Sequence, residues 1–210
     1  TESFNVILLI TVPAAVGLMV LARPIVWLAF ERGAFDPAAT AMTSIALFFY
    51  SLGLVGMALR ILMTNVFYSL QDTKTPMYNG LLALGLNIVL NFIPIGPLAH
   101  GGLALATAIA TTLTTLSLIR GLGKKIGSIG LIGFIKCALK SLLAALIMGV
   151  LTHLAYYSLG DRVPVNAAFE AALLLGTILL GAIAYFLFLY LLKVEEIARF
   201  VNLLKARFGL

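Results

Sequence analysis

Polar residues near the middle of two neighbouring apolar stretches are candidates for function, because polar side chains are costly to bury in a membrane. Asn87 and Asn91 lie four residues apart, so a helix would present both amides on one face. Thr107, Thr111 and Thr114 form a similar face on the next apolar stretch. The short connection over residues 94–102 predicts that the two stretches are antiparallel neighbours. Their polar faces are therefore candidates for a binding site.

The oxygens of this group match those that bind a small alkali cation. Asn87, Asn91 and Thr107 offer side-chain oxygens, and Leu103 offers a backbone carbonyl. Hard oxygen ligands of this kind suit sodium. However, these two stretches contain no carboxylate to offset the desolvation of a cation, and Asn–Thr hydrogen bonds commonly join membrane helices. A sodium site and a hydrogen-bonded helix contact both remain open.

Arg60 is a basic residue well inside an apolar stretch. An arginine at the centre of a bilayer costs about 2.5–3.5 kcal/mol. Arg60 lies nearer one end of its stretch, which allows two interpretations. Its side chain reaches along the helix to the lipid headgroups, or it faces an internal cavity and binds an anionic headgroup such as a phosphate. The second interpretation makes Arg60 a substrate-binding candidate.

The composition is that of a membrane protein. Hydrophobic residues make up 62% of the chain and charged residues 10%, against roughly 45–50% and about 25% in soluble domains. The apolar stretches have the length of a membrane-spanning helix and lack the alternation of barrel strands. The sequence predicts an all-α polytopic bundle of about six transmembrane helices. The predicted spans cover roughly residues 4–22, 41–66, 77–97, 101–121, 135–158 and 170–192.

The distribution of basic residues predicts the orientation. The net charge is +6, but the basic residues lie between the spans rather than on one folded face, which argues against a nucleic-acid partner. They concentrate in the loops after the second and fourth spans and in the C-terminal tail, whereas the opposite loops hold only Arg23, Arg32 and Arg162. By the positive-inside rule, both termini are cytoplasmic.

The glycine-rich segment 121–133 is predicted to be a hinge or linker. We therefore expect four transmembrane helices over residues 1–122. Residues 123–210 should hold two additional helices and an amphipathic cytoplasmic tail, which begins near residue 194.

Two further expectations concern the ends of the chain and its glycines. The chain begins directly at a predicted span, so we expect it to be a piece of a longer protein. Gly53 and Gly56 are expected to allow close helix packing rather than ligand binding.

The acidic residues argue against an enzyme. Catalysis on lipid phosphates needs clustered carboxylates for a metal, or a histidine beside a nucleophile. The eight acidic residues are scattered among the loops and the tail, and the single cysteine, Cys137, cannot form an internal disulfide. We predict no catalytic residue and no metal centre.

Three strings, in this order and spacing, resemble the MurJ/MviN lipid II flippase family of the MATE-like MOP exporter superfamily. They are FERGAFD at residues 30–36, YSLGL at residues 50–54 and FYSLQDTKTP at residues 67–76. The resemblance implies a fourteen-helix flippase of the bacterial inner membrane, of which this chain corresponds to the last six helices. The first four would belong to the C-terminal lobe, and the last two would form a groove for the lipid tail.

The resemblance also implies a mechanism and its partners. Alternating access would carry an undecaprenyl-pyrophosphate-linked peptidoglycan precursor across the membrane, driven by membrane potential or a cation gradient. The partners would be that precursor, membrane lipids and an N-terminal lobe of the same protein. Cell wall biogenesis and cell shape would depend on it.

The site residues transfer only in part. The cavity arginines of the family belong to helices before this chain begins. Some members bind sodium at positions that match Asn87, Asn91, Leu103 and Thr107, and Asn91 stands where those members have an aspartate. The sequence also leaves open another superfamily exporter, for polysaccharide-linked lipids or drugs, and a membrane scaffold that transports nothing.

Overall fold

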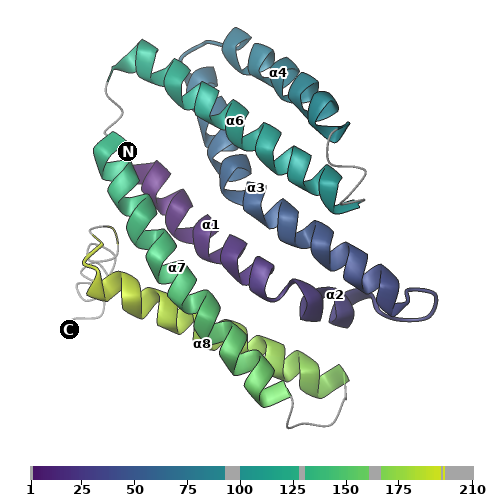
Figure 1. Cartoon of the computed structure of the whole chain (residues 1–210). Coiled ribbons are helices and arrows are strands. Elements are labelled where there is room, and N and C mark those ends of the chain that lie inside the picture. The colour runs from purple at the N-terminus through teal and green to yellow at the C-terminus, as the bar shows by residue number, and fades with distance from the viewer. Residues whose placement is uncertain (1, 93–99, 128–130, 161–166, 195, 197–210) are drawn as a thin grey trace. The chain divides into compact units, whose positions relative to one another are not determined.

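The computed structural model describes residues 2–92, 100–127, 131–160, 167–194 and 196, and the regular structure in these ranges is α-helical (Figure 1). Five of the described helices, α1, α3, α6, α7 and α8, are long and apolar enough to cross a membrane. The predicted all-α membrane bundle is therefore confirmed. The helices are α1 (Glu2–Val20), α2 (Ala22–Phe30), α3 (Pro37–Ser69), α4 (Lys74–Asn91), α6 (His100–Ile126), α7 (Leu131–Gly160) and α8 (Ala167–Leu191).

Aspartate side chains accept hydrogen bonds from backbone N–H groups at the starts of α3 and α4. The Asp36 side chain accepts a hydrogen bond of 2.7 Å from the backbone N–H of Ala39, and Pro37 follows in the first turn. Proline suits that position because the first N–H groups of a helix have no partner within it. At α4, the Asp72 side chain accepts a bond of 3.0 Å from the backbone N–H of Thr75.

Two elements differ from the predicted spans. Arg23 was expected in a loop, but it lies in the nine-residue helix α2, whose Pro24 occupies the first turn, where proline is tolerated. The span predicted over residues 77–97 corresponds to α4, which has 18 residues. The final residues of that span lie outside the described ranges.

The prediction of a linker over residues 121–133 is wrong for most of these residues, which are helical. Residues 121–126 continue α6, and α7 begins at Leu131. A Cβ added at Gly121 would lie 3.7 Å from the ring of Phe67, so this glycine faces a neighbouring helix instead of marking a turn. Gly127, with φ of +80°, adopts the left-handed conformation that glycine favours.

The chain divides into two compact units. Residues 18–129 form one, which we call the α3–α4–α6 unit, and residues 1–17 and 130–210 form the other, the α1–α7–α8 unit. The α1–α7–α8 unit includes most of α1. The predicted boundary at residue 122 had instead grouped the first span with the next three. The amphipathic tail expected from residue 194 onward lies almost wholly outside the described residues.

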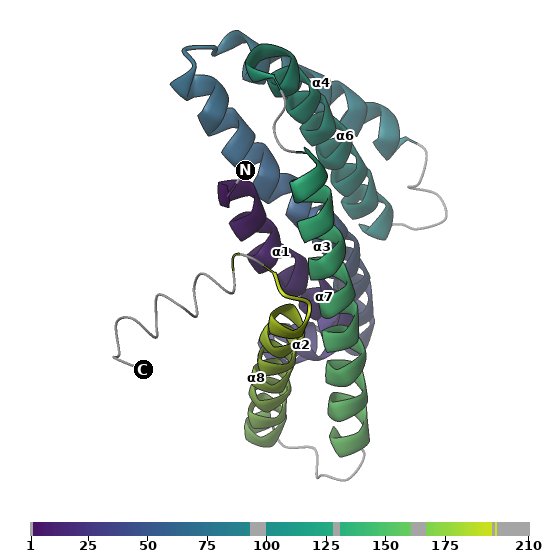
Figure 2. The ribbon, with the colours of Figure 1, turned by 90° about the vertical axis from the view of Figure 1, so that its left-hand side faces the viewer.

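Small residues bring α3 and α6 together in the α3–α4–α6 unit. A Cβ added at Gly53 would lie 2.8 Å from the Cα of Ala108, and one at Gly56 would lie 3.2 Å from the Thr112 hydroxyl. The Thr115 hydroxyl donates to the carbonyl of Gly56 at 2.9 Å. The packing role predicted for both glycines is confirmed. Figures 1 and 2 show α4 beside α6 in the same unit.

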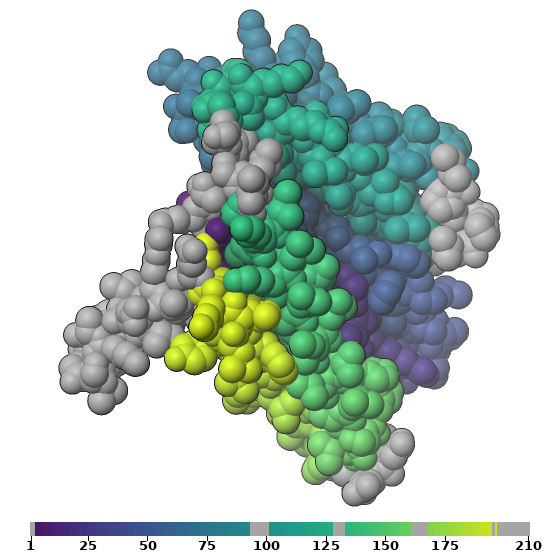
Figure 3. Space-filling view, turned by 60° about the vertical axis from the view of Figure 1, so that its left-hand side comes forward, coloured from purple at the N-terminus to yellow at the C-terminus, as the bar shows by residue number. Residues whose placement is uncertain are grey.

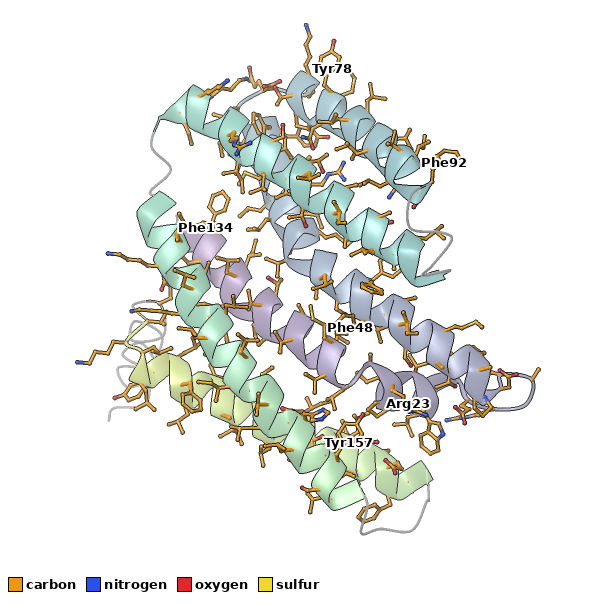
Figure 4. The ribbon with its side chains drawn as sticks, in the orientation of Figure 1. Arg23, Phe48, Tyr78, Phe92, Phe134 and Tyr157 are labelled. Atoms are coloured by element: carbon orange, nitrogen blue, oxygen red, sulfur yellow. The ribbon has the colours of Figure 1, made fainter. Side chains whose placement is uncertain are left out.

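Two polar contacts define an antiparallel hairpin in the α1–α7–α8 unit. Ser141 pairs with Tyr185, and the Tyr156 hydroxyl donates to Glu170 at 2.9 Å. The later residue of α7 thus contacts the earlier residue of α8, so the two helices run in opposite directions. The two helices pack against each other in Figure 3. Near the start of α7, Phe134 meets Phe4 of α1 edge to face, with ring centroids 6.2 Å apart (Figure 4).

Large apolar side chains cover the outward faces of both units. Ile61 is 65% exposed, Ile183 is 70% exposed, and Tyr78 and Phe92 project away from α4 in Figure 4. Soluble proteins rarely expose apolar surface on this scale. Exposed apolar surface of this extent is suited to contact with lipid or with further membrane helices.

Candidate functional site

The four residues predicted to bind a cation do lie together, between α4 and α6. The Asn91 amide donates to the side-chain oxygen of Asn87 at 2.9 Å, and the Asn87 amide donates to the Thr107 hydroxyl at 3.0 Å. Thr107 in turn donates to the carbonyl of Leu103 at 2.9 Å. The residues thus form a directed chain of hydrogen bonds that joins the two helices.

The candidate cation ligands hydrogen-bond to one another. The oxygens of Asn87, Thr107 and Leu103 each already accept a hydrogen bond from another member of the group. The side-chain oxygen of Asn91 is buried and accepts no hydrogen bond from the described residues. All four candidate ligands are neutral, and a buried charge needs compensation. The contacts observed among these residues are those of a hydrogen-bonded pair of helices.

Asn79, which the sequence pattern had not singled out, makes a further contact of the same kind between α4 and α6. We call the contacts of Asn79, Asn87 and Asn91 the asparagine seam. It lies eight and twelve residues before Asn87 and Asn91, so all three fall near one stripe of α4. Its amide donates to the backbone carbonyl of Thr114 on α6 at 2.9 Å. Only 6% of Asn79 is exposed, and its side-chain oxygen has no partner among the described residues. Extending the four-residue spacing backward from Asn91 would have found it.

The seam explains why α4 stays on α6. Asn79 pairs with Thr114, and Asn87 pairs with Thr107, so the contacts run in antiparallel register. This confirms the predicted antiparallel pairing. Thr111 and Thr114, also predicted on this face, are buried, and the Thr114 hydroxyl donates to the carbonyl of Ala110 within α6.

Arg60 lies on α3 beside α4. A terminal nitrogen of its guanidinium is 3.8 Å from the position that a Cβ at Gly80 would take, so the absence of a side chain there gives it space. The side chain is half-buried, and within the described part of the chain it has no hydrogen bond or ion pair. Its positive charge is therefore available to an anion from outside these residues.

Lys125 on α6 and Asp72, just before α4, form an ion pair at the end of the α3–α4–α6 unit. The Thr75 hydroxyl also donates to Asp72, at 2.6 Å, and the Lys125 ammonium lies 5.8 Å from the centre of the Phe67 ring. Hydrogen bonds from Lys125 and then Thr75 hold the pKa of the Asp72 carboxyl well below its usual value. Asp72 thus stays ionised near neutral pH, and the pair joins the end of α6 to the start of α4.

The described residues contain no group of three or more histidine, cysteine or acidic side chains that could hold a metal ion. The polar groups that line α4 in this unit are amides, hydroxyls and one half-buried guanidinium. Such groups can bind an anion or hold helices together.

Comparison with known proteins places this arrangement in a family. The family model described as lipid II flippase MurJ matches residues 1–170. A probable lipid II flippase MurJ of Rickettsia prowazekii is 33% identical over 89% of this chain, and one of Bdellovibrio bacteriovorus is 30% identical over 94%. One from Vibrio cholerae is 42% identical over 53% of the chain.

A solved structure has the same helical arrangement. It is described as lipid II flippase MurJ in an inward closed conformation, and it matches 89% of this chain with a TM-score of 0.73 and 28% identity. The chain spans 37% of that structure and 37% of the Rickettsia relative. It therefore corresponds to little more than a third of the length of such proteins.

Proposed function

This chain belongs to the MurJ family of lipid II flippases, and we propose that it forms part of a transporter that moves lipid II across the bacterial cytoplasmic membrane. The observation that carries this proposal is the family match over residues 1–170, supported by the structural match at a TM-score of 0.73. The chain covers 37% of the matched structure. Two-sided access to a site at the centre of the membrane requires the opposing helices as well.

In this proposal Arg60 contacts the negatively charged headgroup linkage of the lipid. A phosphate-containing linkage is anionic, and arginine binds such groups through two parallel N–H bonds. The space beside Gly80 and the lack of a partner among the described residues leave the guanidinium free for that contact. The apolar outer faces keep both units in the bilayer.

We place both termini on the cytoplasmic side of the inner membrane. The paired Lys125 and Asp72 then lie on the cytoplasmic side, at the end of α6 and just before α4, and Lys74 and Lys124 lie near them. An excess of basic residues on the cytoplasmic side is the strongest sequence guide to orientation. We propose transport without covalent chemistry on the lipid and without a bound cofactor.

We further propose that the asparagine seam holds α4 on α6 and does not bind sodium. Replacing sodium by potassium at constant ionic strength should leave the thermal unfolding midpoint of the full-length gene product unchanged. An Asn91→Asp variant should gain sodium-dependent stabilisation, because a carboxylate there can offset the charge of the cation. Bound ligand at a hundred times its Kd would stabilise by about 2.7 kcal/mol. Sodium-dependent stabilisation of the unchanged protein would show a cation site instead.

The transport proposal is tested by complementation. The full-length gene should restore growth to bacteria depleted of their own lipid II flippase. Membrane insertion is checked in parallel by immunoblotting of the membrane fraction. A protein that inserts stably at normal levels and yet fails to restore growth would contradict the proposal.

A further inference from the structure

Pro13 interrupts the hydrogen-bond ladder of α1 inside its apolar span. Proline has no backbone N–H, so the carbonyl four residues earlier, that of Leu9, loses its helical donor. The span of α1 covers residues 3–20, which places this carbonyl away from water. An unpaired polar group in such a position is costly, and membrane proteins find it a substitute partner.

The substitute comes from α8. The Tyr185 hydroxyl donates to the carbonyl of Leu9 at 2.9 Å, across 176 positions of the sequence. Only 2% of Tyr185 is exposed, so its hydroxyl needs a partner inside the protein. Burial of the hydroxyl is explained once its acceptor is known.

Ser141 on α7 positions this hydroxyl. Its side-chain oxygen lies 2.8 Å from that of Tyr185. Tyrosine has one hydroxyl proton, and that proton is directed to Leu9, so Ser141 must donate to Tyr185. Ser141 itself is fully buried. A chain of two hydrogen bonds therefore runs from α7 through α8 to α1.

We propose that Tyr185 replaces the backbone donor that Pro13 removes and thereby fixes α1 to the α7–α8 hairpin, with Ser141 as its positioning residue. A second polar contact joins α1 to the segment after α8, because the Asn5 amide donates to Glu196 at 2.5 Å. Moving α1 away from the hairpin would leave the Leu9 carbonyl without a donor in an apolar environment. The hydrogen bond from Tyr185 to Leu9 thus favours movement of α1 and the α7–α8 hairpin as one body. This consequence does not depend on which substrate is transported.

A double-mutant cycle in the full-length protein tests the proposal. Tyr185→Phe alone should lower the thermal unfolding midpoint by about 2–4 °C, because it leaves the Leu9 carbonyl without a donor. In a Pro13→Ala background the same substitution should cost much less, since alanine at that position supplies the backbone N–H. Ser141→Ala should have a smaller effect than Tyr185→Phe, because the tyrosine keeps its own proton.

Tyr190→Phe is the matched control. Tyr190 lies on the same helix and is 57% exposed, and its hydroxyl has no hydrogen bond among the described residues, so its substitution should leave the midpoint unchanged. Equal losses from Tyr185→Phe with and without the Pro13→Ala substitution would overturn the proposal, as would no loss in either case. If Tyr185→Phe proves too unstable to purify, its rescue by Pro13→Ala supports the proposal, and failure of that rescue contradicts it.

Discussion

Replacing Arg60 by alanine should slow lipid II translocation roughly 10–100-fold while leaving the protein folded and inserted. A hydrogen bond to a charged group contributes about 1.5–3 kcal/mol, and each 1.4 kcal/mol corresponds to about tenfold. The substitution removes the one half-buried guanidinium on α3 that lacks a partner among the described residues. The measurement is the translocation rate of labelled lipid II in vesicles that contain the full-length protein.

Two variants separate a specific contact from general charge. Arg60→Lys keeps the charge but loses the paired N–H geometry, so its rate should fall between those of the alanine variant and the unchanged protein. Arg120→Ala removes an exposed arginine near the end of α6 and should leave the rate unchanged. Equal rates for Arg60→Ala and the unchanged protein would remove Arg60 from the transport path and favour a role in contacting lipid headgroups.

Replacing Gly53 by alanine should destabilise the α3–α4–α6 unit by about 1–3 kcal/mol, the usual effect of overpacking. The added Cβ would lie 2.8 Å from the Cα of Ala108 and 3.0 Å from its Cβ, so the backbones of α3 and α6 would have to separate. Membrane helices lack a hydrophobic drive to associate and depend on such close contact. Denaturant or thermal unfolding of the full-length protein in detergent measures the loss.

Gly85→Ala is the control, because we expect it to leave the stability unchanged or to raise it. A Cβ there meets nothing within 4 Å, and the residue is in the interior of α4. Alanine favours a helix over glycine by about 1 kcal/mol, so Gly85→Ala should be neutral or stabilising. If both variants lost stability equally, the contact between Gly53 and Ala108 would not be the reason.

Much of the fold could be predicted because membrane helices are read from length and hydropathy. The contact of Asn87 with α6 could also be predicted, since Asn87 and Asn91 share a helix face and a short connection makes α4 and α6 neighbours, whereas Asn79 was missed. The helix α2 was missed because nine residues are too few for a hydropathy window of membrane length. Gly121 was misread as part of a linker because its neighbour, Phe67, is distant in the sequence.

The link between Tyr185 and Leu9 could not be predicted at all. Hydropathy marks both helices as spans, and Pro13 marks a carbonyl that needs a donor. Nothing in helical periodicity says which of the other helices supplies that donor. The same holds for Arg60, whose neighbour Gly80 is evident only once α3 and α4 are placed together.

The most direct test of the central claim is transport by the purified full-length protein in vesicles loaded with labelled lipid II on one leaflet. The account predicts that lipid II moves to the other leaflet faster than in empty vesicles and that Arg120→Ala retains this activity. A correctly folded protein that leaves lipid II on its original leaflet, under a membrane potential and in either sodium or potassium, would contradict it.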